Sequence, residues 1–383
     1  MNTTKILFLL KLIAIVLMAE MVSAQSSNMK FERVRVGDAK QILCGMDLAP
    51  DHSYLAISSI QNFPYYQFDF ENKNVIQQFD VGNWYAGSSV RHSADGRYVL
   101  LQQLFYLDFS LNKDREVDFD IINAANGQRV IHFEKCHAVT IAPDSEHAFS
   151  ISGNEITIWK LPSGEKIRSF ILNQATNGLA VSPDGKYLAV SHKPDEKELK
   201  KDPYYKKNKK ALKAALKYKN QISIFDIESF SLQYTVNSLY DIVYRLEYSP
   251  DGNTLFCLQI PHIKAQSSKS GRQSYISTIN GKTGEPQRMG FTSQASYEPE
   301  FKLSPDGKLF GMVSRNGRFT ELQLFDFETG RIKDRFEESY RLFEKTEVGM
   351  TMGDGRMSFA FLPDNKTLVM TMGNHLIFWE PKL

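Results

Sequence analysis

The stretch Ser182-Pro183-Asp184-Gly185-Lys186-Tyr187-Leu188-Ala189-Val190 decides the fold, because it joins a tight turn to an alternating apolar strand. Proline at the second turn position presets φ, Asp184 can accept hydrogen bonds from the backbone beside it, and Gly185 accepts a positive φ. Apolar residues at 179 and 181 alternate in the same way before the turn. The stretch therefore predicts two antiparallel strands joined by a hairpin reversal.

Related turns recur along the whole chain. Seven copies are present, at positions 50–51, 94–96, 143–144, 183–185, 250–252, 305–307 and 363–364. Counted from the turn proline, or from Ala94 in the second copy, the residues four and two positions earlier are apolar except at His92. This spacing predicts a strand with one buried face before every turn.

Each copy contains the pattern of four strands. The third strand ends in a large apolar residue followed by a polar one, as at Trp159-Lys160 and Phe325-Asp326, and a second turn leads to the fourth strand. Seven such copies predict an all-β, seven-bladed β-propeller with four antiparallel strands per blade. The last copy lacks its fourth strand, so we expect the alternating segment 31–36 to complete the C-terminal blade and close the ring.

The Pro-Asp-Gly turns and the stretches 156–164 and 324–330 resemble WD40 and YVTN-type propeller repeats. The resemblance covers about residues 31 to 383. It implies a propeller scaffold of the exported, bacterial type. A scaffold of this kind hosts many functions, so the fold does not name the activity.

Residues 1–24 have the pattern of a secretory signal peptide, with Lys5 and Lys11 near the start, an apolar run, and Val22-Ser23-Ala24 before the expected cleavage point. The apolar run is shorter than the roughly 20 residues that cross a bilayer, so we expect no transmembrane anchor. The mature domain, residues 25–383, is predicted to be periplasmic or extracellular. Its 44 basic and 43 acidic residues nearly cancel, and nucleic acid is not an expected partner.

The three cysteines provide little stabilisation. Cys44, Cys136 and Cys257 are odd in number and lie in three different repeats, so at most one disulfide can form. Buried free thiols are the simpler expectation.

The loop between the second and third strands varies most among the repeats. The distance from the turn proline to the polar residue after the third strand ranges from 17 to 43 residues. In a propeller this loop emerges on the rim where each new blade is entered, which also receives the long connection 337–356. We call this side the elaborated rim and the side with the Pro-Asp-Gly turns the short-turn rim. Loops on a rigid scaffold commonly carry binding, so the elaborated rim is the candidate site; unconstrained variation in loop length is the alternative.

The largest insertion, residues 193–221, is rich in lysine. Its composition favours a short basic amphipathic helix with Leu212, Ala215, Leu216 and Lys219 on one face, preceded by a flexible stalk around Pro203. Such a helix suits an anionic surface, whether phospholipid, lipopolysaccharide, acidic polysaccharide or acidic protein. The lysines proposed to make this contact are Lys206, Lys207, Lys209 and Lys210. A solvated, partly disordered loop is the alternative.

Aromatic residues are expected to gather on the same rim, where exposed clusters suit contacts with protein or sugar. The candidate partner-binding aromatics are Tyr65, Tyr66, Trp84, Tyr85, Tyr204, Tyr205, Tyr240, Tyr297 and Tyr340. Packing in the core or within loops is the alternative role for each.

The sequence contains no recognised catalytic or metal-binding motif, and no cofactor is predicted. Several methionines and His375 would suit a thioether copper site in an exported protein, although methionine more often fills gaps in a core. These residues are Met350, Met352, Met357, Met370 and Met372.

The position three residues before the turn proline is expected to face the central channel. It carries Asp47 and Arg91 in the first two copies, and Glu247 and Lys302 in the fifth and sixth. We therefore predict ion pairs between neighbouring blades at the channel.

The leading interpretation is an exported, non-enzymatic scaffold that binds a protein or a cell-envelope component through its elaborated rim. Two alternatives remain open. One is a propeller enzyme of the lactonase, lyase or hydrolase type with its site at the channel mouth, and the other is a carbohydrate-binding propeller.

Overall fold

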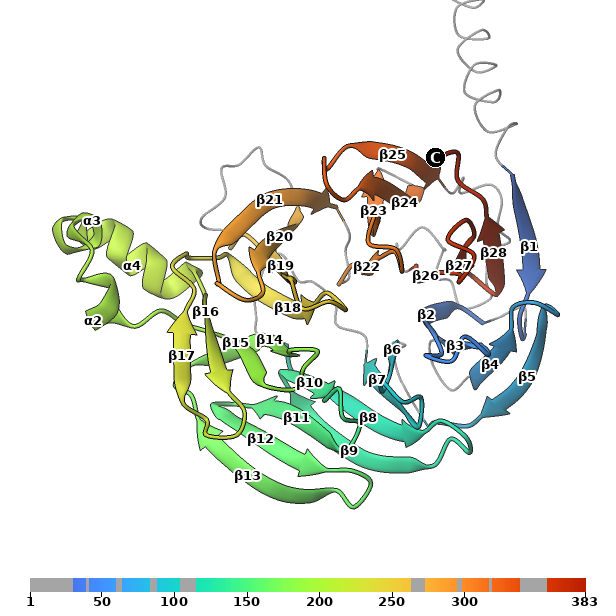
Figure 1. Cartoon of the computed structure of the whole chain (residues 1–383), viewed down its shortest axis with the longest axis horizontal. Helices are drawn as coiled ribbons and strands as arrows, with labels where there is room; N and C mark the ends of the chain where they lie inside the picture. The colour runs from blue at the N-terminus through green and yellow to red at the C-terminus, as the bar shows by residue number, and fades with distance from the viewer. Residues whose placement is uncertain are drawn as a thin grey trace, which may run out of the picture.

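The computed structural model of the chain describes residues 30–38, 41–59, 64–82, 88–103, 115–262, 273–294, 298–316, 319–337 and 357–383. These residues form seven four-stranded antiparallel sheets arranged in a ring around a central channel (Figure 1). The predicted all-β, seven-bladed propeller is confirmed. The predicted signal peptide, residues 1–24, lies outside the described residues.

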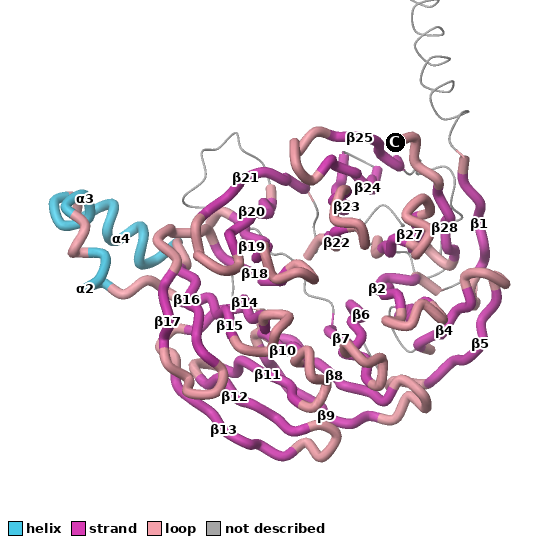
Figure 2. The backbone as a smooth tube through the Cα atoms, in the orientation of Figure 1, coloured by secondary structure: helices cyan, strands magenta, loops and turns pink. Residues whose placement is uncertain are grey.

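Blades 1 to 6 are each built from strands that are consecutive in the chain and run outward from the channel (Figure 2). Blade 1 contains β2 (Leu43–Leu48), β3 (Leu55–Ser59), β4 (Tyr65–Asp69) and β5 (Asn74–Phe79). Blade 2 contains β6 (Ser88–His92), β7 (Tyr98–Gln103), β8 (Val117–Asn123) and β9 (Arg129–Cys136). Blade 3 contains β10 (Ala138–Ile141), β11 (His147–Ser152), β12 (Glu155–Lys160) and β13 (Glu165–Ile171).

The next three blades repeat this order. Blade 4 contains β14 (Ala175–Val181), β15 (Tyr187–His192), β16 (Gln221–Asp226) and β17 (Leu232–Thr235). Blade 5 contains β18 (Ile242–Tyr248), β19 (Thr254–Ile260), β20 (Ser274–Asn280) and β21 (Pro286–Ser293). Blade 6 contains β22 (Phe301–Leu303), β23 (Leu309–Asn316), β24 (Phe319–Asp326) and β25 (Ile332–Glu337).

The turn of blade 4 shows why the repeated motif forms hairpins. Asp184 Oδ1 accepts hydrogen bonds from Ser182 Oγ at 2.6 Å and from the backbone N–H of Lys186 at 3.1 Å. Ser182 Oγ in turn accepts from the backbone N–H of Tyr187 at 2.9 Å, and Gly185 has a φ of +72°. The same serine–aspartate bond is present at Ser93–Asp95, Ser249–Asp251 and Ser304–Asp306. The serine before the turn and the aspartate within it therefore both hold the reversal by hydrogen bonds.

Blade 7 closes the ring with strands from both ends of the described chain. It contains β26 (Phe359–Phe361), β27 (Leu368–Met372), β28 (His375–Trp379) and β1 (Phe31–Arg35). β1 pairs antiparallel with β28, with Phe31 opposite Trp379 and Val34 opposite Leu376. The predicted closure is confirmed, and it leaves the backbone of β28 paired on both sides.

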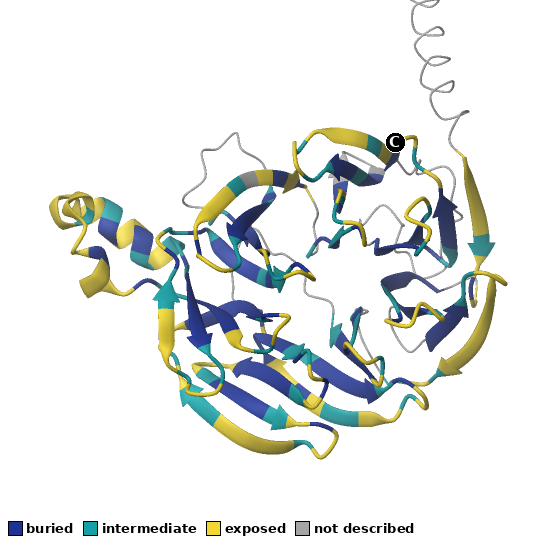
Figure 3. Ribbon diagram, in the orientation of Figure 1, coloured by how far each residue is buried: buried dark blue, intermediate teal, exposed yellow. Residues whose placement is uncertain are grey.

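The hydrophobic core lies between neighbouring blades rather than in a single centre. The inner strands are mostly buried (Figure 3). One cluster joins blades 7 and 1 and includes Leu43, Met46, Val369 and Leu376, while others join the remaining blades in pairs. Outer strands such as β5 and β13 are largely exposed. Cys44, Cys136 and Cys257 are buried thiols that form no disulfide, as expected.

The lysine-rich insertion forms an arm of three helices that projects beyond the perimeter of the ring (Figure 1). The helices are α2 (Glu196–Leu199), α3 (Pro203–Lys207) and α4 (Lys209–Tyr218). The side chains of Asp195, Asp202 and Asn208 accept hydrogen bonds from the first turn of the helix that each precedes. The predicted helix is confirmed, but the expected flexible stalk is wrong, because two capped helices occupy its place.

The arm has a small core of its own, made by Leu199, Leu212 and Ala215 with Leu239 of the neighbouring loop packed against it. Lys219 forms an ion pair with Asp241 at 2.5 Å, which ties the end of the arm to blade 5. In the part of the chain that the structure describes, no helix has the length and apolar character needed to cross a bilayer.

Candidate functional site

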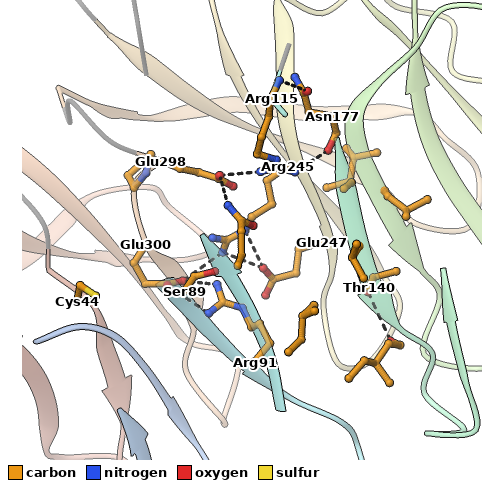
Figure 4. Close-up of a pocket in the computed structure, with 18 of the residues that line it drawn as sticks. Cys44, Ser89, Arg91, Arg115, Thr140, Asn177, Arg245, Glu247, Glu298 and Glu300 are labelled. Carbon is orange, nitrogen blue, oxygen red and sulfur yellow. Dashed lines mark hydrogen bonds and ion pairs between the residues drawn. The ribbon is translucent and has the colours of Figure 1, made fainter. Parts of the chain in front are cut away.

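A cavity of about 270 Å³ lies in the central channel (Figure 4). Its wall is formed mainly by residues of blades 2 to 6, and Cys44 of blade 1 and Met357 beside blade 7 also line it. Charged and amide side chains line one part of it, and Leu100, Leu179 and Leu246 line another. Several polar lining residues, including Arg115, Asn177 and Glu298, stand near strand ends that connect to loops of the elaborated rim. The cavity therefore lies toward the rim that the sequence identified as the candidate site.

Two ion pairs cross the channel between blades 2 and 6. Arg91 donates to both carboxylate oxygens of Glu300, with Nη2–Oε1 at 2.6 Å and Nη1–Oε2 at 3.2 Å. Arg245 of blade 5 also approaches Glu300 Oε1 at 3.3 Å and lies over the Phe301 ring, with its guanidinium carbon 3.8 Å from the ring centroid. Glu300 thus neutralises two arginines from different blades.

The second crossing pair joins Arg115 to Glu298, with Nη1–Oε2 at 2.7 Å. Arg115 also donates from Nε to the carbonyl of His137 at 2.6 Å and from Nη2 to the carbonyl of Asn177 at 3.0 Å. Gln102 donates to the same Glu298 oxygen at 3.1 Å. The side chains of Arg115 and Glu298 are 4% and 8% exposed, so both charges are held by bonds inside the protein.

The ion pairs expected between neighbouring blades, Asp47 with Arg91 and Glu247 with Lys302, are wrong in their partners. Asp47 pairs with Lys302 of blade 6 at 2.7 Å instead of with Arg91, and it also accepts from the backbone N–H of His92 at 2.9 Å. Glu247 pairs with Arg245 of its own strand at 2.9 Å instead of with Lys302. The small Ala360 holds the equivalent position in blade 7, so the long Lys302 side chain can pass it and reach blade 1.

These contacts keep the buried carboxylates ionised. Burial by itself raises the pKa of Glu300, but the charges of Arg91, Arg245 and Lys302 outweigh it and lower the pKa to about 2. The pKa of Asp47 is also lowered, because Lys302 and His92 outweigh the effect of burial. Arg115 and Arg245 lower the pKa of Glu298 against burial in the same way.

The remaining binding capacity of the cavity lies in a few polar groups. Glu298 Oε1 has no hydrogen bond from the described residues, and the side chain of Glu247 is 40% exposed. Three arginines face three glutamates, so the wall presents both signs of charge with little net excess. Among the described residues, no three of His, Cys, Asp and Glu gather in a way that would hold a metal ion. Such a wall suits a small polar ligand better than a strongly charged one.

The lysines of the arm are the second notable charged feature. Lys206, Lys207, Lys209 and Lys210 are exposed, and none forms an ion pair with a described residue. By contrast, Lys200 and Lys201 pair with Glu196 and Glu198 in α2. The end of the arm therefore carries uncompensated positive charge on a preorganised helical frame.

The aromatic residues expected on the elaborated rim are divided by the structure. Tyr65, Tyr66 and Tyr240 are buried in the core, so their predicted exposure is wrong; as strand or strand-adjacent residues, they pack between sheets. Tyr204 is 58% exposed, and Tyr205 packs edge-to-face against it while contacting the core of the arm. Trp84, Tyr85, Tyr297 and Tyr340 lie outside the described residues.

The methionines considered for copper serve as packing where they are described. Met357, Met370 and Met372 are buried in one hydrophobic cluster with Phe359 and Trp379, which satisfies their apolar side chains without a metal. Met350 and Met352 lie outside the described residues.

Sequence reasoning missed Arg115, Arg245, Glu298 and Glu300. The alternation of strand faces could have predicted two of them. Arg245 and Glu300 stand two residues before Glu247 and Lys302, so they lie on the same strand face, which was expected to line the channel. Arg115 and Glu298 precede their strands, and no pattern marks them. Comparison with known proteins found no protein-family model and no curated protein that matches this chain.

Proposed function

We propose that this chain is an exported, non-enzymatic binding propeller of the WD40/YVTN type that holds an anionic protein or cell-envelope component against its elaborated rim. The arm is the principal contact. The observation that carries the proposal is the run of exposed lysines, Lys206, Lys207, Lys209 and Lys210, without ion pairs to described residues.

The helical frame supports this role. Leu212 and Ala215 are buried within the arm, so α4 directs its apolar face inward and leaves its lysines to solvent. An arm that buries its apolar face cannot insert that face into lipid, so its contact with a partner is electrostatic. Because the helices are preformed, little conformational entropy is lost when a partner binds.

The experiment is a pull-down from cell-envelope extract with the mature chain as bait. The test variant carries Lys206→Glu, Lys207→Glu, Lys209→Glu and Lys210→Glu, and we expect it to lose the partner that wild type captures. Capture by wild type should also weaken as salt rises from about 50 to 200 mM, because exposed charges are screened over a Debye length of about 10 Å at 0.1 M.

A matched control reverses four exposed lysines on the short-turn rim: Lys160, Lys186, Lys308 and Lys366. It changes the net charge equally and should retain the partner. If both variants capture the partner as wild type does, or both lose it equally, the assignment of binding to the arm is refuted.

A second candidate function, a propeller enzyme with its site at the channel mouth, is favoured by one observation. The central cavity holds Glu298, a buried carboxylate with one oxygen free of hydrogen bonds from the described residues. The enzyme interpretation predicts turnover of lactone, ester or polyuronate probes that Glu298→Gln abolishes at a temperature where circular dichroism shows the variant still folded, although the loss of the partner of Arg115 lowers its stability. Turnover that survives Glu298→Gln would place the chemistry elsewhere.

A further inference from the structure

A second and larger pocket, of about 540 Å³, lies on the short-turn rim between blades 4 and 5. Three tyrosines line it: Tyr187 at the start of β15, Tyr234 in β17 and Tyr248 at the end of β18. Asp184 and Asp251 of the two Pro-Asp-Gly turns stand beside them. The pocket is on the opposite rim from the arm, so it is independent of the function proposed above.

At the two neighbouring boundaries, between blades 3 and 4 and between blades 5 and 6, an arginine bridges the two blades. Arg168, opposite Ile158 in blade 3, donates to the carbonyl of Glu228 in blade 4 at 3.1 Å. Arg288, opposite Thr278 in blade 5, donates to the carbonyl of Phe327 in blade 6 at 2.9 Å. Both arginines therefore bridge from the fourth strand of one blade to the turn of the next.

Tyr234 holds the corresponding position in blade 4, because it pairs with Ile224, two residues before the polar end of its third strand. Its ring packs on the turn of blade 5, where a Cβ on Gly284 would lie 2.4 Å from Tyr234 Cε2. Replacing the bridging arginine by a tyrosine leaves the space between the two turns open. At the boundary between blades 3 and 4, the positions of Tyr187 and Tyr248 are occupied by His147 and Val181. At the boundary between blades 5 and 6, they are occupied by Thr254 and Leu303. The three tyrosines thus coincide at a boundary whose two neighbours each have the arginine; the same position carries Gln77, Ile131 and Asp334 in blades 1, 2 and 6.

The polar groups of the pocket remain available for a ligand. Asp184 uses Oδ1 for its turn and has no hydrogen bond from the described residues to Oδ2. Gln233 donates from Nε2 to Ser231 at 2.9 Å, which leaves its carbonyl oxygen open, and the Lys282 side chain is exposed. Tyr187 is 37% exposed, whereas the hydroxyl of Tyr248, another lining residue, is buried. The wall combines aromatic faces with separate donors and acceptors.

We propose that this pocket binds an oligosaccharide, with the tyrosine rings stacking on sugar faces and Asp184, Gln233 and Lys282 bonding the hydroxyls. A sugar ring has an apolar C–H face bordered by hydroxyls that both donate and accept, which matches this wall. An anionic ligand is disfavoured by Asp184 and Asp251, which outnumber Lys282, and a purely apolar one would leave the carboxylate of Asp184 poorly solvated. The volume lies within the 300–1,000 Å³ that is typical of small-ligand sites.

The experiment screens the mature chain on a glycan array and then titrates soluble neutral trisaccharides (cellotriose, maltotriose and chitotriose) by calorimetry. We expect at least one of these trisaccharides or array glycans to bind. Tyr187→Ala should weaken the binding about fivefold, since an aromatic contact contributes about 1 kcal/mol and 1.4 kcal/mol is tenfold. Tyr187→Phe, which keeps the stacking face, should stay within about threefold of wild type.

The sharpest variant is Tyr234→Arg, which restores the residue found at the flanking boundaries and should close the pocket and abolish binding. Because Arg168 and Arg288 already occupy this position in the same fold, the variant should unfold at the wild-type denaturant concentration. Tyr204→Ala, on the arm, is the matched control and should bind as wild type does. The proposal is overturned if no glycan binds below about 10 mM, if a bound glycan is insensitive to both Tyr187→Ala and Tyr234→Arg, or if the pocket binds proline-rich peptides in place of sugars.

Discussion

Arg91 of blade 2 and Glu300 of blade 6 form a two-point ion pair across the central channel, with N–O distances of 2.6 and 3.2 Å. Blades 7 and 1 lie between them in the ring, and blade 7 is the one completed by β1 from the opposite end of the chain. The pair therefore braces the ring beside the place where it is closed. Lys302 and Asp47 link blades 6 and 1 in the same region.

Glu300→Gln is expected to destabilise the propeller by about 3 kcal/mol, because it leaves Arg91 and Arg245 without their shared counter-charge in a buried site. Urea unfolding followed by tryptophan fluorescence measures the change. Glu146→Gln, which removes one of the two acidic partners of the exposed Arg97, is the control and should leave the midpoint unchanged. Equal effects of the two substitutions would contradict a special role for the crossing pair.

The stability of the protein should fall in acid because of these carboxylates. In the folded state, burial by itself raises the pKa of Glu300. The charges of Arg91, Arg245 and Lys302 outweigh burial and lower this pKa from 4.5 to about 2. A lowered folded pKa gives stability that is fully present above about pH 4.5 and is lost as the pH falls toward 2. Urea midpoints at a series of pH values should therefore decline across this window, and the decline should be shallower in Glu300→Gln. Parallel profiles for the two proteins would be inconsistent with this assignment.

Removal of β1 should open the ring. A chain that begins after Arg35 lacks the partner of β28 and exposes its backbone, which favours edge-to-edge association. We expect the midpoint of thermal unfolding to fall by more than about 5 °C and dimers or aggregates to appear in size-exclusion chromatography. A chain that begins at Lys30 is the matched control. A shortened chain that stays monomeric with an unchanged midpoint would show that β1 does not contribute to closure.

The close packing of blades 4 and 5 requires glycine at position 178. A Cβ there would lie 2.7 Å from Ser191 Oγ and 2.8 Å from Val243 Cγ1. Gly178→Ala should therefore cost about 1–3 kcal/mol of unfolding free energy. Val243→Ala in the same chain removes one of three close contacts, the third being with Leu246 Cγ at 2.9 Å, so the double variant should be more stable than the sum of the single effects predicts. Strict additivity in a double-mutant cycle would argue that the two blades relax freely around the new methyl group.

The order of the arm depends on its caps. Asn208 Oδ1 accepts from the backbone N–H of Ala211 at 3.0 Å, and Asn208→Ala removes this cap at a cost of about 1 kcal/mol to α4. Hydrogen exchange of peptides covering 209–218 should accelerate about fivefold, while the strands of blade 4 exchange at the wild-type rate. Asn208→Asp keeps the acceptor and should exchange slowly, as wild type does. Faster exchange in the Asp variant as well would show that the helix does not depend on this cap.

The architecture of this protein is local in origin, and for that reason the amino-acid sequence by itself determined it. Turns such as Ser182–Gly185 bond within themselves, and the alternating residues on either side require one buried face. The unit is repeated seven times, and one terminal strand has no partner in its own repeat. A closed ring buries the faces of all seven blades and pairs that strand. Blade number, closure by β1 and the buried cysteines followed from these short-range rules.

The charged channel and both pockets were decided by the tertiary structure. Arg91 meets Glu300 from 209 positions away in the chain, and long flexible side chains can reach several blades, so spacing along the sequence selects none of these partners. Likewise, Tyr187, Tyr234 and Tyr248 belong to three strands of two blades, and only the packing of those blades brings them into one pocket, with Tyr234 at the position that carries an arginine at both flanking boundaries. Burial also separated Tyr65 and Tyr240 from the exposed Tyr204, since exposure depends on which sheet covers a ring rather than on the ring's own chemistry.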